Sequence, residues 1–223
     1  DEMISLDLLE SLPQVDADSL GVVGCSGGGT QSSYLGAMDS RVKAASMACY
    51  ISTKEIDMLW NAGGGGDGEQ TWPHGIFNGL DKPDLIEVRA NQSTQVLITS
   101  ADADFPAAGG LAAVAEAQSA YAALGGELHV FEGVWHHGWV LPTREQINAF
   151  FCKSLAAGFL GGWTSAGCDN STEVDVSAEN PSFLEWNDEQ LKVTSTGQIN
   201  TAPECIAPGA HISKTVHNFS ADL

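Results

Sequence analysis

Basic residues are scarce in this chain. Lys and Arg number 9 among 223 residues, whereas Asp and Glu number 29, so the formal charge is -20. Such a charge repels the phosphates of nucleic acids and the surface of anionic membranes, and it leaves no basic stripe that could hold either. We therefore exclude nucleic acid and membrane as partners. The acidity fits solubility in a secreted or salty setting.

Long apolar runs are missing as well. No stretch approaches the roughly 18 uninterrupted apolar residues of a membrane-spanning helix. The start, Asp1-Glu2-Met3, has no basic region followed by an apolar stretch, so we expect any signal peptide to lie outside this sequence. Apolar residues still make up 43% of the chain, which is enough to bury the core of one domain.

The sequence also lacks the common signatures of metal and nucleotide sites. It contains no His-x-x-x-His or Cys-x-x-Cys spacing, and the adjacent His136 and His137 point their rings apart on an extended chain. The glycines at 63–66 are not followed by the Gly-Lys-Ser or Gly-Lys-Thr of a phosphate loop. We therefore expect no catalytic metal and no cofactor.

Cysteines are few and odd in number, so at most two disulfides can form and one thiol is left over. The five are Cys25, Cys49, Cys152, Cys168 and Cys205. Cys25 is the candidate for the free thiol. Cys168 and Cys205 lie in polar, loop-like sequence, where a disulfide between them would fasten the C-terminal tail. Cys49 and Cys152 lie in apolar stretches, where a buried free thiol is the alternative.

Three acceptor tripeptides for N-glycosylation begin at Asn91, Asn170 and Asn218. Each tripeptide recurs by chance, but together the three favour a secretory route if the source is a eukaryote. We therefore expect a secreted or extracellular glycoprotein.

The most informative pattern is Gly-x-Ser-x-Gly at residues 24–28. It follows a short apolar run at 20–23 and precedes a helix that we expect to begin near Thr30. A strand, this turn and a helix in succession form a nucleophile elbow, which exposes the serine hydroxyl above the end of a sheet. A glycine-rich turn without chemistry is the alternative, and the strand and helix on its two sides favour the elbow.

The elbow assigns a role to each of its residues. Ser26 is the predicted nucleophile, held at a strained backbone angle. Gly24 and Gly28 are the small residues that let strand and helix approach each other closely. Because the helix directs unbonded N–H groups and the positive end of its dipole at the reacting centre, we expect the N–H of Gly27 to stabilise an oxyanion.

Apolar runs alternate with helical patterns along the rest of the chain. We expect strands at 20–23, 42–51, 95–100 and 127–134, and helices at 3–12, from about 30, at 110–124 and at 143–160. Strands and helices that alternate at these lengths predict an α/β protein with a mostly parallel sheet and helices on both faces. The glycine-rich stretch at 61–68 is expected to form a flexible loop or lid.

The other two members of a catalytic triad are expected where later strands end. Asp102 follows the strand at 95–100, and His137 follows the strand at 127–134. The order Ser, Asp, His is that of the α/β-hydrolases. His137 is then the general base and Asp102 orients its ring. Asp104 and His136 are close rivals, and a helix cap or a solvated turn is the alternative role for each.

Aromatic residues lie near both ends of this proposed site. Trp72 and His74 follow the glycine-rich stretch, and Trp135 and His136 precede the proposed base. We expect these four side chains to line the substrate pocket, where indole rings can stack on sugars. Aromatic side chains that fill a core are the alternative.

Several segments resemble the secreted α/β-hydrolases of the acetyl xylan esterase and related carbohydrate esterase type. They are residues 22–31, 41–45, 81–85, Asp102 with Phe105 and Pro106, 115–117 with 121–125, and His137-Gly138, and 191–198 resembles a terminal hairpin of that group. The resemblance implies the α/β-hydrolase fold and assigns acid and base to Asp102 and His137. Trp135-His136 replaces the small or acidic residues usual in that group.

The resemblance also implies an incomplete front half. An α/β-hydrolase of this type places several strands before the elbow, together with the loop that gives the second oxyanion donor, whereas about 25 residues precede Ser26 here. We expect a chain that lacks its N-terminal strands and pairs with an N-terminal fragment of the same precursor. Residues 1–164 are expected to form the C-terminal part of the catalytic domain. Residues 165–223 are expected to form an irregular extension with a hairpin, packed on the same domain.

These observations predict a serine hydrolase that cleaves a carboxylic ester through an acyl-enzyme, and we expect the ester to lie on a polysaccharide. A peptidase of the prolyl-oligopeptidase type is one alternative, because it shares the fold and the order of the triad. The other alternative is a catalytically inactive hydrolase-fold module in a glycoprotein assembly.

Overall fold

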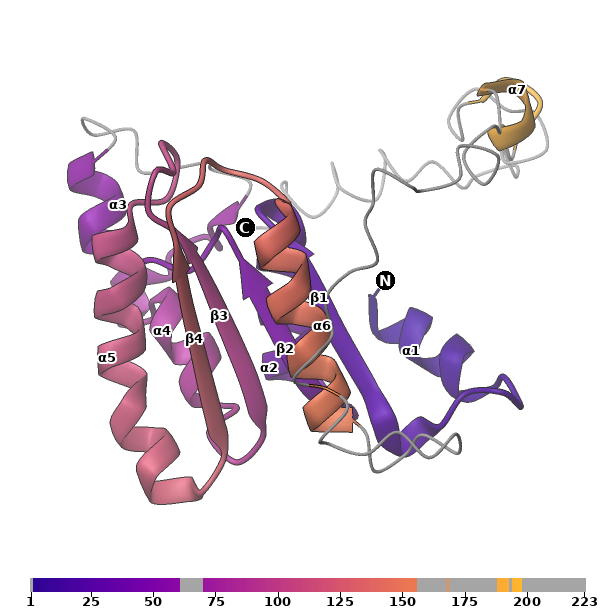
Figure 1. Cartoon of the computed structure of the whole chain (residues 1–223), viewed down its shortest axis with the longest axis horizontal. Coiled ribbons are helices and arrows are strands. Elements are labelled where there is room, and N and C mark those ends of the chain that lie inside the picture. The colour runs from indigo at the N-terminus through magenta and orange to yellow at the C-terminus, as the bar shows by residue number, and fades with distance from the viewer. Residues whose placement is uncertain (1, 61–69, 156–167, 169–187, 193, 198–223) are drawn as a thin grey trace, which may run out of the picture. The chain divides into compact units, whose positions relative to one another are not determined.

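The computed structural model describes residues 2–60, 70–155, 168, 188–192 and 194–197 (Figure 1). The chain separates into two compact units, Asp1–Glu173 and Val174–Leu223. The described part of the second unit is the short helix α7 (Asp188–Leu191) and a turn at 194–197. The domain boundary predicted at 164 and nearly all of the glycine-rich stretch lie outside the described residues, so these predictions stay untested.

Four parallel strands form one sheet in the order β1-β2-β3-β4. The strands are β1 (Leu20–Cys25), β2 (Val42–Ala48), β3 (Ser93–Thr99) and β4 (Glu127–Gly133). The four predicted strands are therefore confirmed, although the second ends three residues early. It ends there because Cys49 has a φ of 53°, which an extended strand does not allow.

Helices connect and cover these strands. They are α1 (Glu2–Glu10), α2 (Gly27–Met38), α3 (Lys54–Trp60), α4 (Lys82–Glu87), α5 (Ala107–Leu124) and α6 (Leu141–Leu155). The helix after the elbow begins at Gly27 rather than near Thr30, because the N–H of Thr30 already donates to the carbonyl of Ser26 at 2.9 Å. Among the helices of the described residues, none is long and apolar enough to cross a bilayer.

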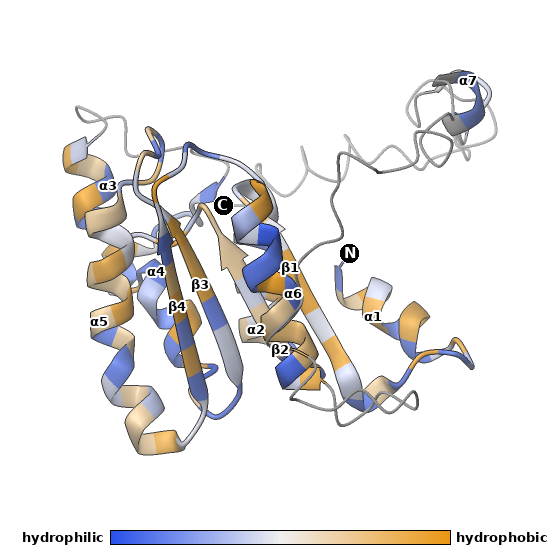
Figure 2. Cartoon of the chain, in the orientation of Figure 1, coloured by the Kyte–Doolittle hydropathy of each residue, from blue (hydrophilic) through white to orange (hydrophobic). Residues whose placement is uncertain are grey.

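Helices lie on both faces of the sheet, as predicted. Helices α2, α4 and α5 cover one face and α6 covers the other (Figure 1). Strand β3 shows the alternation, since Val96 and Ile98 belong to the larger apolar cluster while Leu97 packs with Ile147 of α6 in a second cluster. The C-terminal half of β3 is accordingly hydrophobic in Figure 2, whereas α6 carries hydrophilic residues on its outer side.

The cysteine pairing differs from the prediction. Cys152 of α6 is bonded to Cys168, with 5.5 Å between their Cα atoms, so the predicted pair of Cys168 with Cys205 is wrong. The apolar stretch around Cys152 had indicated a buried thiol, but this residue is only partly buried near the end of α6, where a loop residue reaches it. Cys25 and Cys49 are free thiols, as proposed for each.

The first turn of α2 lies directly against β1. A Cβ atom added to Gly24 would stand 2.1 Å from the backbone of Gly28, and one added to Gly29 would stand 2.8 Å from the carbonyl oxygen of Ala48. The prediction for Gly24 is confirmed. The prediction for Gly28 is wrong, because a Cβ atom there would meet nothing within 4 Å, and the second small residue that the packing requires is Gly29.

This packing predicts opposite outcomes for two alanine substitutions. Gly24→Ala forces strand and helix apart and should lower the free energy of unfolding by about 3 kcal/mol, the upper end for an overpacked core. Gly28→Ala is the matched control and should stay within about 1 kcal/mol of the parent, because alanine favours a helix and meets open space. Urea unfolding measures both, and equal losses of stability would contradict the packing described.

Candidate active site

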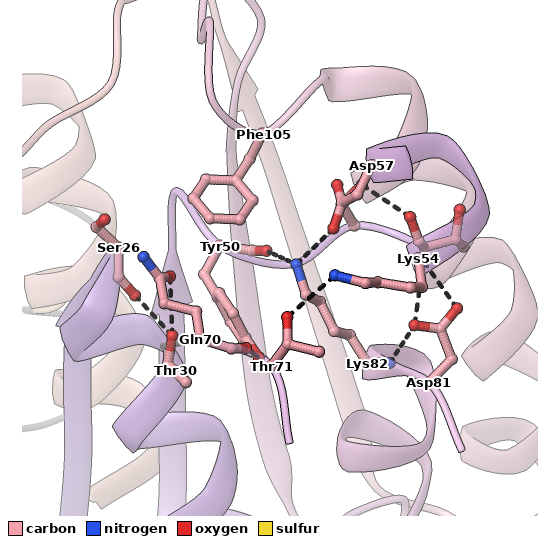
Figure 3. A network of polar contacts seen from close by, with 12 residues as sticks. Ser26, Thr30, Tyr50, Lys54, Asp57, Gln70, Thr71, Asp81, Lys82 and Phe105 are labelled. Atoms are coloured by element: carbon pink, nitrogen blue, oxygen red, sulfur yellow. Dashed lines mark hydrogen bonds and ion pairs between the residues drawn. The ribbon is translucent and has the colours of Figure 1, made fainter. Parts of the chain in front are cut away.

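Ser26 lies in the turn between β1 and α2 with a φ of 58° and a ψ of -121°. Such a backbone conformation costs a residue with a side chain about 1–3 kcal/mol and persists only where the surroundings hold it. Here the N–H of Ser26 donates to the carbonyl of Ala48 at 3.0 Å, and its own carbonyl accepts from the N–H of Thr30. The Thr30 hydroxyl adds a second bond to that carbonyl at 3.3 Å (Figure 3).

The first turn of α2 offers backbone donors next to Ser26. The first N–H groups of a helix have no partner within it, and α2 begins at Gly27. A Cβ atom added to Gly27 or Gly28 would meet no other atom within 4 Å, so there is open space on the side-chain side of both residues. An anion beside Ser26 would meet both these donors and the positive end of the helix dipole.

Asp102 follows β3 and is buried, and its carboxylate is held on both oxygens. Oδ1 accepts the N–H groups of Asp104 at 2.8 Å and Phe105 at 3.1 Å. Oδ2 accepts the hydroxyl of Thr99 at 2.8 Å and lies 2.8 Å from Nδ1 of His137. These four contacts fix the position and the orientation of the carboxylate.

His137 follows β4 and takes Asp102 as its partner. Asp104 comes no closer than 3.9 Å to Nδ1, and its side chain is 66% exposed against 1% for Asp102. With a proton on Nδ1, the ring donates to Asp102 and keeps the lone pair of Nε2 for a base. The neighbouring His136 is exposed to solvent. The geometry therefore favours Asp102 over Asp104 and His137 over His136.

The surroundings of His137 change its proton affinity. Burial alone would lower the pKa of His137, but the hydrogen bond to Asp102 and the charge of that carboxylate outweigh burial and raise the pKa above 6.5. The ring of Phe105 also stacks on the imidazole, with 5.8 Å between centroids and 28° between planes. Asp102 and Phe105 thus hold the imidazole from two sides.

A buried ion pair, Lys82 with Asp57, lies next to Phe105 (Figure 3). Nζ of Lys82 donates to Asp57 at 2.7 Å and to the carbonyl of Tyr50 at 3.3 Å. The same ammonium group lies 4.6 Å from the ring centroid of Phe105 and 4.5 Å from that of Tyr50. Burial lowers the pKa of Lys82, and the charge of Asp57 opposes this effect. The pair therefore ties the loop after β2 to the loop after β3.

Three side chains at this edge of the sheet were not predicted as site residues. Thr99 donates to Asp102, and Phe105 stacks on His137. The three-residue spacing from Thr99 to Asp102 is the signal for Thr99, and Phe105 is among the residues that carry the resemblance. Cys49 is 2% exposed, and its thiol donates to the carbonyl of Gly138 at 3.4 Å. Its positive φ cannot be read from the sequence.

Cys25 packs against the apolar cluster that contains Cys49. A hydrogen bond from Cys25 lowers the pKa of Cys49, and the same bond raises the pKa of Cys25. The sulfur of Cys49, a carboxylate oxygen of Asp102 and a ring nitrogen of His137 lie within 4.8 Å of one another. These three are the donors in the described chain that a metal ion could share.

The ends of all four strands thus supply this region. Ser26 follows β1, Cys49 follows β2, Asp102 follows β3 and His137 follows β4. The hydrogen bonds among the described residues include Asp102 with His137 and none between Ser26 and His137. The structure therefore brings the proposed acid and base into contact, while the proposed nucleophile lies at the same edge of the sheet.

The four predicted pocket residues fall into two pairs. Trp72 packs edge-on against Tyr34 at 5.8 Å, and the exposed His74 follows it. Trp135 stacks on Phe131 at 6.0 Å, and the exposed His136 follows it. No ring contact within the described residues joins the two pairs. That the four residues line one pocket therefore stays a prediction.

Of three comparisons with known proteins, one finds similar proteins. A scan of protein-family models finds no match, and a search of curated proteins finds none. Among solved structures, the chain is similar to a carbohydrate esterase family 15 glucuronoyl esterase from Caldicellulosiruptor kristjansonii. The TM-score is 0.56 at 17% identity, over 69% of this chain and 48% of that one.

Two further structures are similar. A promiscuous CE15 esterase from a marine bacterial metagenome gives a TM-score of 0.51 at 16% identity, over 69% of this chain and 46% of that one. The acylaminoacyl peptidase of Pyrococcus horikoshii gives 0.50 at 17% identity, over 67% and 26%. The chain thus spans between a quarter and a half of the length of these structures. With the parallel sheet and its two helical layers, these likenesses show that the chain has part of an α/β-hydrolase fold.

Proposed function

We propose that this chain carries the catalytic centre of a serine hydrolase that cleaves carboxylic esters. The observation that carries the proposal is the 2.8 Å contact between buried Asp102 and Nδ1 of His137, at the same sheet edge as a strained Ser26. A serine at a strained elbow, an imidazole and a buried carboxylate are the three groups that acyl transfer requires.

The reaction follows from the position of these groups. His137 accepts the Ser26 proton on Nε2 as Oγ attacks the ester carbonyl, and Asp102 stabilises the imidazolium that forms. The N–H of Gly27 donates to the developing oxyanion at the positive end of α2. His137 then protonates the leaving alcohol, and a water molecule activated by the same imidazole hydrolyses the acyl-enzyme.

The ester is proposed to lie on a polysaccharide, outside the cell. Two of the similar structures are named as CE15 esterases, and the partly exposed Trp72 and Trp135 offer ring faces of the kind that stack on sugars. The disulfide between Cys152 and Cys168 fits an oxidising compartment.

The second oxyanion donor is proposed to come from an associated N-terminal fragment of the same precursor. Strand β1 is an edge of the described sheet, and the side chain of Val23 on it is 41% exposed. A further strand paired with β1 would cover this edge.

A peptidase is the second candidate. It is supported by the likeness to the acylaminoacyl peptidase of Pyrococcus horikoshii, and its chemistry would use the same three side chains. The two candidates differ in the leaving group, so matched ester and amide substrates separate them.

The proposal predicts covalent labelling of Ser26. A fluorophosphonate should phosphonylate the native protein at the peptide that contains Ser26, because only an activated serine reacts quickly. Ser26→Ala should remove the label, and Ser40→Ala, which removes an exposed hydroxyl in the turn after α2, should keep it. Native, folded protein that takes no label would favour the inactive assembly module instead.

The proposal also predicts a pH profile set by Asp102. His137 must be neutral to act as a base, and its pKa is raised above 6.5, so kcat/KM should fall as pH drops through that higher pKa. Asp102→Asn removes the two strongest effects that raise the pKa of His137, so burial, which lowers this pKa, is opposed only by the weaker effects of Cys49 and Asp104. The acid limb should therefore move to lower pH, while kcat falls on the order of 10⁴-fold.

Asp104→Asn is the matched control for this profile. Loss of this exposed carboxylate should change kcat by no more than about fivefold, which corresponds to the free energy of an exposed ion pair. The variants are compared by the rate at which they cleave an activated aryl ester from about pH 4 to about pH 10, because this range covers both sides of an imidazole pKa. Equal losses in both variants, or an unmoved acid limb in Asp102→Asn, would contradict the assignment.

A further inference from the structure

Three donor atoms of different chemistry converge beside the proposed catalytic centre. The sulfur of Cys49, a carboxylate oxygen of Asp102 and a ring nitrogen of His137 lie within 4.8 Å of one another. Thiolate, carboxylate and imidazole are the three side-chain ligands that Zn²⁺ takes in proteins. Cys49 makes no contribution to the proposed ester hydrolysis, so its place in this cluster is unexplained by that function.

We propose that Cys49, Asp102 and His137 bind a divalent cation of the zinc class, and that the bound cation reversibly inhibits the hydrolase. The inhibition rests on the function proposed above, whereas the binding does not. The site has three protein ligands and leaves a fourth position for water, on the side where the His137 side chain is 26% exposed.

A cation bound at this site must replace the hydrogen bond between His137 and Asp102. Tetrahedral zinc with bonds of about 2.0–2.3 Å holds its donor atoms roughly 3.3–3.6 Å apart. Nδ1 of His137 and Oδ2 of Asp102 are 2.8 Å apart, so they must separate by about 0.5 Å to accept the cation between them. The sulfur of Cys49 must move in from its hydrogen bond with the carbonyl of Gly138, at 3.4 Å.

The protons balance in a way that explains the inhibition. Cys49 loses its thiol proton to solvent and binds as thiolate, and Asp102 binds as carboxylate. Neutral His137 binds through the Nδ1 lone pair, so the proton formerly on Nδ1 resides on Nε2. An imidazole with its proton on Nε2 cannot accept the proton of Ser26. Removal of the cation restores the former tautomer and the contact with Asp102.

The carboxylate is already held for this role. Its oxygens keep the bonds from Thr99, Asp104 and Phe105 when the contact to His137 opens. Groups that hold a ligand in this way lower the cost of ordering it around a metal. Cys49 is held likewise, because its backbone N–H donates to the carbonyl of Leu97 at 3.1 Å.

Cobalt(II) in place of zinc gives a direct readout of binding. Metal-free protein titrated with Co²⁺ should bind one equivalent and gain the near-ultraviolet charge-transfer band of a cobalt thiolate. Cys49→Ser and Cys49→Ala should lose this band and weaken binding tenfold or more, a change at least as large as the loss of an outer-shell partner. Cys205→Ser is the control for the cysteine outside the described residues, and this variant should keep both the band and the affinity for Co²⁺. Circular dichroism verifies that each variant is folded.

Fluorophosphonate labelling gives the readout of inhibition. Zn²⁺ should block labelling of the parent protein, and a chelator should restore it, whereas addition of Zn²⁺ should not change the labelling rate of Cys49→Ser. No band in the folded parent, a band that survives in Cys49→Ser, or a band that is lost in Cys205→Ser would overturn the site. Zinc that binds without blocking the label would overturn the inhibition. A protein that binds cobalt through Cys49 but takes no label without metal would support the site and count against the hydrolase.

Discussion

The contact of α2 with β1 at Gly24 is the constraint on which the site depends. Because residue 24 has no side chain, the backbone of Gly28 can lie against it, and the chain must reverse at Ser26 within one residue. The reversal requires a φ of 58° at Ser26 and leaves the first N–H groups of α2 beside that residue. The carbonyl of Ala48 on β2 holds the turn through the N–H of Ser26. The close approach of α2 to β1 therefore explains the strained backbone of Ser26, the backbone donors beside it and the position of the proposed nucleophile.

The parallel sheet then determines which other residues lie near Ser26. All four strands end at one edge, so the residues that follow them gather there without being near in sequence. Asp102 is fixed by four contacts, one of them with His137. Phe105 stacks on the imidazole of His137, and the ammonium group of Lys82 lies over the ring of Phe105. The buried pair of Lys82 with Asp57 thus supports the orientation of an imidazole that neither residue touches. The same convergence places Cys49 among the ligands of the proposed cation site.

Much of this fold could be predicted because its strands are short apolar runs bounded by turns. The elbow could be predicted because it depends on glycines and a serine in adjacent positions. The choice between Asp102 and Asp104 could not, since it rests on which carboxylate is buried. Cys152 was misjudged because an apolar neighbourhood does not show that a residue lies at a partly exposed helix end. The apolar stretch around Cys49 indicated a buried thiol but not its place beside Asp102 and His137, because that place depends on a backbone angle and on loops distant in sequence.

The central claim is that Ser26 and His137 act as one acyl-transfer centre, and the acyl-enzyme tests it most directly. Native protein is mixed with an activated aryl acetate, quenched in acid within a turnover and analysed by mass spectrometry. The account predicts one added acetyl group on the peptide containing Ser26, and none in protein that carries His137→Ala. Hydrolysis of the ester without any acetyl group on that peptide, or acetylation of Ser26 that does not require His137, would contradict the account.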